Sequence, residues 1–372
     1  MRTYLALILF VSVGCTGTTS GSGGRDSGVG GGEDSGTVGA LDGANPAVDG
    51  GPVVIPGEPR GDARVFFSGH SLINVNTPTF FEQLATRNGR DVDYQLQMGL
   101  GSTLSIRLAC PLNGQQADGS ALTFRVADEL RSGRYDTLMF TERHDIVQTI
   151  AYERTTSMAR RLRDAFYEGS PGGRVFFFES WLTIDVARPS GFVERTRRDA
   201  IGWECVASRL NESRGSHPPL LVVPAARALA ELVEDVTAGR AAGLTNLRQI
   251  FTDDVHLTNE GNYFISLLHY GVVLQESPIG LSASGLRPIA DPPPSLDDAS
   301  ASYLQGLAAR WVERTFAEAA ASQRARSECG AAVRSLCVDT LGAGDWACSQ
   351  IESAWADDSA AVPTINEPWC RR

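Results

Sequence analysis

Between residues 62 and 275, short apolar runs alternate with longer stretches in which apolar side chains recur at helical spacing. The apolar runs are rich in Val, Phe, Leu or Tyr and predict buried strands over residues 64–68, 91–97, 137–141, 174–180 and 220–224. The helical spacing predicts helices over residues 77–87, 122–131, 149–167, 191–210, 225–238 and 259–273. Strands that alternate with long helices indicate βαβ units, so we expect an α/β fold with a mostly parallel sheet. Its active site is expected at the carboxyl ends of the strands.

The chain on either side of this region has a different composition. Residues 1–15 combine one Arg, an apolar run and small residues up to Cys15, a pattern typical of an export signal. Residues 16–60 hold 14 Gly and no aromatic residue, which predicts a disordered linker. Three consecutive prolines at 292–294 mark a second boundary, and the spacing beyond them predicts a helix over 303–326. We therefore expect a catalytic domain over 61–289 and a helical, disulfide-stapled extension over 290–372.

The end of the export signal resembles a bacterial lipobox. Ser12-Val13-Gly14 precede Cys15, although Ser12 stands where lipoboxes usually carry Leu. The resemblance implies a lipid on Cys15 that anchors the protein to a membrane of the cell envelope. Ordinary signal cleavage beside an incidental Cys, followed by secretion, is the alternative. Either way, the protein is not expected in the cytoplasm.

Net charge and cysteine content indicate which partners the protein can bind and whether it forms disulfides. The net charge is −11 and all 33 positive charges are Arg without a basic run, which argues against a nucleic-acid partner. Beyond Cys15 there are six cysteines, and an oxidising compartment favours three disulfides among them. We expect Cys110 to pair with Cys205, and the four cysteines of the last 45 residues to pair among themselves: Cys329, Cys337, Cys348 and Cys370. A zinc site is the alternative there, but the tail has no His and no C-x-x-C spacing.

Two segments carry residues suited to nucleophilic catalysis. The first predicted strand delivers Ser71 just past the sheet edge, where Gly69 permits a tight turn and the next helix offers free N–H groups. Asp253 precedes His256 by three residues, so its carboxylate can orient the imidazole. Ser71, His256 and Asp253 then supply the nucleophile, general base and orienting group of a serine esterase. A plain turn at Ser71, and a helix cap with a buried His256, are the alternatives.

These segments make the chain resemble the SGNH or GDSL-like hydrolases, over roughly residues 62–275. The family's first block, Gly-Asp-Ser, is matched by Gly69-His70-Ser71, and its last block, Asp-x-x-His, by Asp253 and His256. The resemblance implies a flavodoxin-like three-layer sandwich with a parallel five-stranded sheet. It also implies an oxyanion hole that includes the Ser71 amide and a Gly after the second strand, for which we choose Gly101 over Gly99.

The third block departs from the family pattern. Most members carry Gly-x-Asn-Asp, whereas this chain reads Thr-Glu-Arg-His-Asp over residues 141–145, with His144 in the place of the Asn. An imidazole N–H of His144, or the Arg143 guanidinium, can donate to an oxyanion. A purely structural ion pair of Arg143 with Glu142 or Asp145 is the alternative. Together with Glu179 and Trp181 after the next strand, this block resembles an uncharacterised bacterial branch of the superfamily.

The sequence thus predicts an exported serine ester hydrolase that works without a cofactor. Its substrate is expected to be an acylated glycan or a lipid, with acyl transfer to a sugar as a variant; the oligomeric state is left open. Two alternatives stay open. One is a metal-dependent hydrolase with ligands drawn from His70, His144, Asp145, Asp253 and His256. The other is a non-catalytic surface module that binds a glycan or a partner on the same scaffold.

Overall fold

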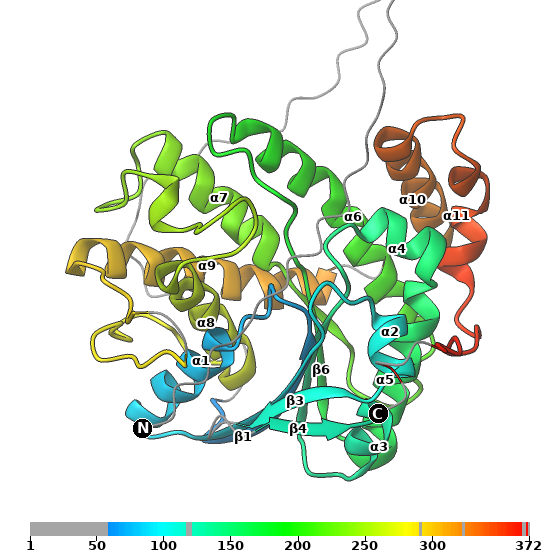
Figure 1. The fold of residues 1–372 in the computed structure, drawn as a ribbon, viewed down its shortest axis with the longest axis horizontal. Helices are drawn as coiled ribbons and strands as arrows, with labels where there is room; N and C mark the ends of the chain where they lie inside the picture. The colour runs from blue at the N-terminus through cyan, green and yellow to red at the C-terminus, as the bar shows by residue number, and fades with distance from the viewer. Residues whose placement is uncertain (1–58, 117–120, 290–291, 322–323, 367–369, 371–372) are drawn as a thin grey trace, which may run out of the picture. The chain divides into compact units, whose positions relative to one another are not determined.

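The computed structural model describes residues 59–116, 121–289, 292–321, 324–366 and 370. These residues form an α/β fold around a seven-stranded sheet with the order β4-β3-β2-β1-β5-β6-β7 (Figure 1). The strands are β1 (Asp62–Gly69), β2 (Asp91–Met98), β3 (Leu112–Gln116), β4 (Ala121–Phe124), β5 (Thr137–Thr141), β6 (Arg174–Phe178) and β7 (Leu221–Val223). Strands β2, β1, β5, β6 and β7 run parallel, in the order of a flavodoxin-like sheet. The expected five-stranded parallel sheet is confirmed.

Strands β1, β5 and β6 contain apolar runs because both faces of the sheet are covered, whereas β2 alternates apolar residues with Asp and Gln. In β1, Val65 and Phe67 face one hydrophobic core, while Phe66 between them faces the other. The same alternation recurs in β5, where Met139 lies in the first core and Leu138 in the second. Strands buried on both faces read as continuous apolar runs, which is why the sequence pattern located them.

Helices cover both faces of the sheet and make the outer two layers (Figure 1). One face carries α1 (Asn76–Arg87), α7 (Ala225–Thr237), α8 (Asn259–Leu274) and α9 (Asp298–Ala321). The other face carries α3 (Val126–Arg131), α4 (Ile146–Glu153), α5 (Thr155–Gly169), α6 (Ser190–Glu212), α10 (Arg326–Leu341) and α11 (Trp346–Ala356). The short helix α2 (Leu104–Ala109) follows β2, and a 3-10 helix, η1 (Leu247–Gln249), precedes the Asp253 turn.

Several predicted elements differ from the structure. The helix expected over 122–131 is shorter, because residues 112–116 and 121–124 form the antiparallel strands β3 and β4 at the edge of the sheet and α3 begins only at Val126. The helix expected over 149–167 is two helices, α4 and α5, separated by Arg154 with φ of 57°, a left-handed conformation that interrupts a helix. Helices α2, α10 and α11 were not predicted.

Three disulfides are present, but the predicted pair Cys110–Cys205 is wrong, and of the four tail cysteines only Cys337 and Cys348 pair with each other. Cys110 bonds Cys370, Cys205 bonds Cys329, and Cys337 bonds Cys348. The partners are set by how the helices pack. Helix α10 packs against α6, so Cys329 on α10 lies beside Cys205 on α6. Cys110, just after α2, meets the last cysteine of the chain. The disulfides indicate an oxidising compartment outside the cytoplasm.

The C-terminal extension packs on both faces of the sheet. Leu304 and Leu307 of α9 belong to the core that also holds α8, while Val333 of α10 and Ile351 of α11 belong to the opposite core. The expected signal over 1–15, with Cys15, and the linker over 16–60 lie outside the described residues except for 59 and 60. Within the described ranges, none of the helices is both long and apolar enough to cross a bilayer.

Candidate active site

Ser71 lies in a turn at the carboxyl end of the central strand β1. Gly69 ends this strand, and a Cβ at Gly69 would lie 2.7 Å from Cδ1 of Ile73, so the glycine permits a close approach of the turn. The Ile73 amide closes the turn by donating to the His70 carbonyl at 2.9 Å. Helix α1 begins at Asn76, one residue before the predicted start at 77, so four residues separate Ser71 from the first residue of the helix.

Asp253 and His256 lie in a tight turn that precedes α8. Asp253 Oδ1 accepts hydrogen bonds from the amides of Val255 and His256, both at 2.7 Å. The Thr252 amide donates to the His256 carbonyl at 2.9 Å and closes the turn. Thr258 caps α8 by accepting a hydrogen bond from the Gly261 amide, so Asp253 is not the helix cap.

The side chains of these two segments form one chain of hydrogen bonds. His256 Nδ1 lies 2.7 Å from Asp253 Oδ2, and His256 Nε2 lies 3.0 Å from Ser71 Oγ. An ionised carboxylate can only accept, so in the neutral ring Nδ1 carries the proton and Nε2 accepts from the Ser71 hydroxyl. The sequence-predicted Ser, His and Asp therefore meet within hydrogen-bond distance, in the orientation that proton transfer from the hydroxyl to the imidazole requires.

This group lies at an accessible surface. The side chains of His256 and Asp253 are 39% and 56% exposed, so a substrate can approach them from solvent. Partial burial raises the pKa of the Asp253 carboxyl, but the hydrogen bonds from His256 and Val255 outweigh it and hold that pKa below its usual value. Asp253 is therefore ionised at neutral pH, as an orienting group must be.

His70, which directly follows β1, is a structural residue. It is buried, its Nδ1 accepts from the Leu72 amide at 3.4 Å, and its Nε2 lies 3.1 Å from the Glu142 carbonyl. Burial, with the nearby Arg107 charge, lowers the pKa of His70 to about 3, so the ring is neutral. Both ring nitrogens are engaged within the protein, which removes His70 from the set of candidate metal ligands. The described residues contain no group of three or more His, Cys, Asp or Glu side chains placed to hold a metal ion.

The loop after β2 carries the glycine predicted for the oxyanion hole. Gly101 has φ of 62°, a conformation that favours glycine, and its position leaves open space around a Cβ. The Gly99 amide donates to the Gly69 carbonyl at 3.0 Å and so is already used to join the loop to β1. This contact favours Gly101 over Gly99 as a donor to a substrate.

A buried arginine, which the sequence did not single out, ties this loop to the sheet. Arg107 of α2 is fully buried and donates to Ser68 Oγ at 3.2 Å, to the Ser102 carbonyl at 2.8 Å and to the Thr141 carbonyl. Burial lowers the pKa of Arg107 to about 10 despite the attraction of buried Glu142, so the guanidinium keeps its charge. Its three partners lie on β1, on the Gly101 loop and on β5, so Arg107 fixes the three segments that frame the site.

Glu142 and Arg143, at the end of β5, are both engaged in structural contacts. Glu142 Oε1 accepts from the amides of Leu104 and Arg143 at 3.0 and 2.7 Å, and burial raises its pKa against the charge of Arg107. Arg143 pairs with Asp145 through two contacts of 2.7 and 3.0 Å. Of the alternatives for this block, the structural ion pair with Asp145 is therefore present.

His144 is half-buried beside these groups. Burial lowers its pKa, and the charges of Arg143 and His256 add to the effect, while Asp145 opposes it. Its ring centroid lies 6.3 Å from that of His70. His144 is thus a neutral imidazole near His256, and a neutral ring carries the single N–H that an oxyanion donor needs.

The turn that bears His256 is held from two sides. The buried indole of Trp181 donates from Nε1 to the Val255 carbonyl at 2.7 Å, and the Ile184 amide donates to the Asp254 carbonyl at 2.7 Å. On the other side, Arg248 donates to the Asp253 carbonyl at 2.9 Å. Trp181, which the sequence placed at the catalytic edge, therefore contacts the turn from the core.

Glu179, the other residue of this segment, is also buried. Its carboxylate pairs with Arg227 at the start of α7, and burial raises its pKa against the charge of that arginine. Both Glu179 and Trp181 are thus engaged within the protein. They support the shape of this edge of the sheet instead of lining a substrate site.

Comparison with known proteins gives a fold likeness and no family. No protein-family model matches the chain, and no curated protein matches it. Among solved structures, the chain is similar to a DUF4886 family protein from Bacteroides uniformis, with a TM-score of 0.47 and 11% sequence identity. The likeness covers 67% of this chain and 94% of that one. It is a distant likeness of fold.

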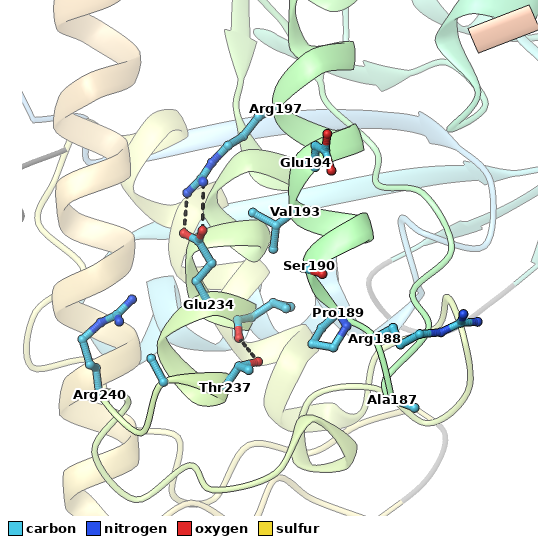
Figure 2. Close-up of a pocket in the computed structure, with 12 residues that line it drawn as sticks. Ala187, Arg188, Pro189, Ser190, Val193, Glu194, Arg197, Glu234, Thr237 and Arg240 are labelled. Carbon is cyan, nitrogen blue, oxygen red and sulfur yellow. Dashed lines mark hydrogen bonds and ion pairs between the residues drawn. The ribbon is translucent and has the colours of Figure 1, made fainter. Parts of the chain in front are cut away.

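A cavity of about 920 Å³ lies apart from these residues, between the start of α6 and the end of α7 (Figure 2). Val193 and Val233 contribute apolar side chains to it, and Arg197 pairs with Glu234 at its edge. Neither Ser71 nor His256 lines this cavity. This cavity is therefore separate from the partly exposed surface around Ser71 and His256.

Proposed function

We propose that the protein is an exported serine ester hydrolase of the SGNH or GDSL-like type. One observation carries the proposal: Asp253, His256 and Ser71 form a continuous hydrogen-bonded chain with distances of 2.7 and 3.0 Å. The three residues come from opposite ends of the folded region and meet at the carboxyl edge of a parallel sheet, where such folds place their ligands. The likeness of the sequence blocks to that superfamily adds to the proposal.

The reaction begins when Ser71 Oγ attacks the ester carbonyl carbon and its proton moves to His256 Nε2. The Asp253 carboxylate holds the ring in the required tautomer and stabilises the imidazolium. The negative charge on the carbonyl oxygen is met by the amides of Ser71 and Gly101, with an N–H of His144 as the third donor. Each such donor contributes about 3 kcal/mol to transition-state stabilisation in acyl transfer.

The second half of the cycle releases the products. The tetrahedral intermediate collapses, its bond to the alcohol breaks, and His256 returns the proton to the leaving alkoxide. Water then attacks the acyl-enzyme as His256 takes its proton, and the acid leaves with Ser71 restored. A sugar hydroxyl in place of this water gives acyl transfer. The residues of the site perform every proton movement, so the cycle requires no cofactor.

The substrate proposed is an ester of a glycan or a lipid at the cell envelope. A lipid on Cys15, which lies outside the described residues, would tether the enzyme to a membrane there. The disulfides fit an oxidising compartment.

The test is hydrolysis of p-nitrophenyl acetate and longer-chain esters by the purified protein, together with labelling by a fluorophosphonate. We expect turnover and labelling to be lost in Ser71→Ala but retained in Ser282→Ala, which changes an exposed serine elsewhere. Peptide mass spectrometry should place the label on Ser71. A folded protein whose activity survives Ser71→Ala, or is lost only on addition of a chelator, would refute the serine mechanism.

A further inference from the structure

The buried guanidinium of Arg107 contacts all three segments that carry the proposed oxyanion donors. Its Nε donates to Ser68 Oγ at 3.2 Å, and its terminal nitrogens donate to the carbonyls of Ser102, at 2.8 Å, and Thr141. These partners belong to the end of β1, to the loop after β2 and to the end of β5. Each partner lies within three positions of one donor along the chain: Ser68 of Ser71, Ser102 of Gly101, and Thr141 of His144.

The turn from Gly99 to Ser102 shows what this contact does to a donor. The Gly99 amide donates to the Gly69 carbonyl at 3.0 Å, and the Ser102 amide and hydroxyl donate to the Gly99 carbonyl at 3.0 and 2.7 Å. Arg107 donates to both the carbonyl and the hydroxyl of Ser102, so it holds the far end of the turn. Within the described ranges, the Gly101 amide has no hydrogen-bond partner. The turn is thus held at both ends, and the amide between them is left for a ligand.

Arg107 is itself held at its backbone, so its side chain extends from a fixed point. Gln97 of β2 donates from Nε2 to the Arg107 carbonyl at 3.1 Å. Helix α2 has only six residues, and a helix this short is not stable alone in water. Its first amide donates to Glu142 Oε1 at 3.0 Å, and the residue after its last turn forms the Cys110–Cys370 disulfide. The helix therefore depends on these tertiary contacts at both ends.

The shape of the guanidinium suits this task better than a point charge does. Arg presents its N–H groups in a rigid planar fork, whereas the Lys ammonium is a compact charge on a flexible stem. A Lys at position 107 keeps the charge but cannot donate to three separated segments in the same geometry. Oxyanion donors must lie about 2.7 to 3.1 Å from the oxygen that becomes charged. A misplacement of about 1 Å reduces the rate about 100-fold.

We propose that Arg107 is a positioning residue for the oxyanion hole, because it sets the distances between the three donors on β1, β5 and the Gly101 loop. It contacts neither the substrate nor the reacting atoms, and it acts through the backbone of its partners. The inference rests on the proposed function, since it concerns the transition state of that reaction. It predicts that the exact shape of a buried side chain controls the rate of the chemical step.

Arg163 of α5 provides a matched control. It is 1% exposed, and it donates to the carbonyls of Leu210 and Ser213, at the end of α6. Arg107→Lys and Arg163→Lys therefore both remove a guanidinium from the interior, and we expect both to lower the free energy of unfolding. Only Arg107→Lys changes contacts to the segments that carry the oxyanion donors.

The test measures turnover of p-nitrophenyl acetate and inhibition by benzeneboronic acid, whose tetrahedral adduct with Ser71 resembles the intermediate. We expect Arg107→Lys to lower kcat and the affinity for the boronic acid about 100-fold, with KM within threefold and an unchanged shape of the pH profile. Arg163→Lys should keep kcat and the boronic acid affinity within twofold. Ser102→Ala, which removes only the hydroxyl contacts of the turn, should lower kcat about fivefold.

The outcomes separate this inference from the proposed function. An active enzyme whose kcat and boronic acid affinity stay within twofold in Arg107→Lys overturns the positioning role and leaves the esterase in place. Equal losses of kcat in Arg107→Lys and Arg163→Lys would assign the effect to the stability of the fold, which also overturns it. Where Arg107→Lys does not fold, Ser102→Ala decides, and an unchanged kcat refutes the inference. An unmodified protein without esterase activity overturns the proposed function and this inference together.

Discussion

His269 of α8 provides a sharp test of how burial controls stability in this fold. Its imidazole is fully buried among the rings of Phe67, Phe81 and Phe178, and neither nitrogen has a hydrogen-bond partner within the described structure. Burial lowers the pKa of His269 from 6.5 to about 3. The unfolded chain therefore takes up this proton near pH 6.5, while the folded protein resists it until pH 3.

The sign and size of the effect follow from this difference. Above pH 6.5, protonation of His269 does not affect the free energy of unfolding. As the pH falls from 6.5 to 3, this protonation lowers the free energy of unfolding by about 5 kcal/mol in total, and below pH 3 the loss is complete. Between pH 7 and pH 5 the loss amounts to about 2 kcal/mol. His269→Leu removes the titration and also the unpaired ring nitrogens, so we expect about 1 to 3 kcal/mol of added stability at pH 7.

The assay is urea unfolding at pH 7 and pH 5, followed by tryptophan fluorescence with the disulfides intact. The unmodified protein should lose about 2 kcal/mol more than His269→Leu between the two values. His269→Gln, which keeps polar atoms but does not titrate, should show the reduced pH dependence without the gain at pH 7. Equal losses in the unmodified protein and His269→Leu, or a less stable His269→Leu at pH 7, would refute the reasoning.

Three further predictions concern the site and the extension. Trp181→Phe removes the indole donor from the turn that bears the general base, so kcat for p-nitrophenyl acetate should fall about tenfold, equivalent to about 1.4 kcal/mol; an unchanged kcat and pH profile would contradict a positioning role. Asp253→Asn should lower kcat on the order of 10⁴-fold without unfolding the protein, because an amide does not select the productive imidazole tautomer; steady-state kinetics beside circular dichroism checks this, and wild-type turnover would exclude the assignment. Replacing Cys337 and Cys348 by Ser opens a loop that spans 11 positions, which should cost about 3 kcal/mol in urea unfolding; an unfolding free energy equal to that of the unmodified protein would contradict this expectation.

Most strands and the candidate triad could be predicted because a strand that is buried on both faces of the sheet appears in the sequence as a run of apolar residues. Strands β1, β5, β6 and β7 contain apolar runs, and residues that follow parallel strands meet at one edge of the sheet. This logic places Ser71 at the end of β1. The Asp253–His256 spacing then suggested its partners, and the structure brings their side chains within hydrogen-bond distance.

Other features depend on contacts that a linear pattern does not contain. Arginine is usually exposed, so nothing in the chain marks Arg107 as a fully buried residue whose partners lie on three separate segments. Strand β3 is short and mostly polar, and β4 is only four residues long and lies just before α3, so its apolar residues were read as the start of that helix. The cysteine partners depend on how α10 packs on α6, which sequence order alone does not determine.

The Cys110–Cys370 disulfide encloses the other two along the chain, and Cys205–Cys329 and Cys337–Cys348 follow one another without overlap. A chain that enters an oxidising compartment from its N-terminus presents Cys110 and Cys205 first, and these two are not partners. Their correct partners arrive later, the last of them almost at the end of the chain. Maturation of this protein therefore depends on keeping the early thiols reduced or on a disulfide isomerase that undoes an early bond, and a host without such an activity should yield mispaired protein.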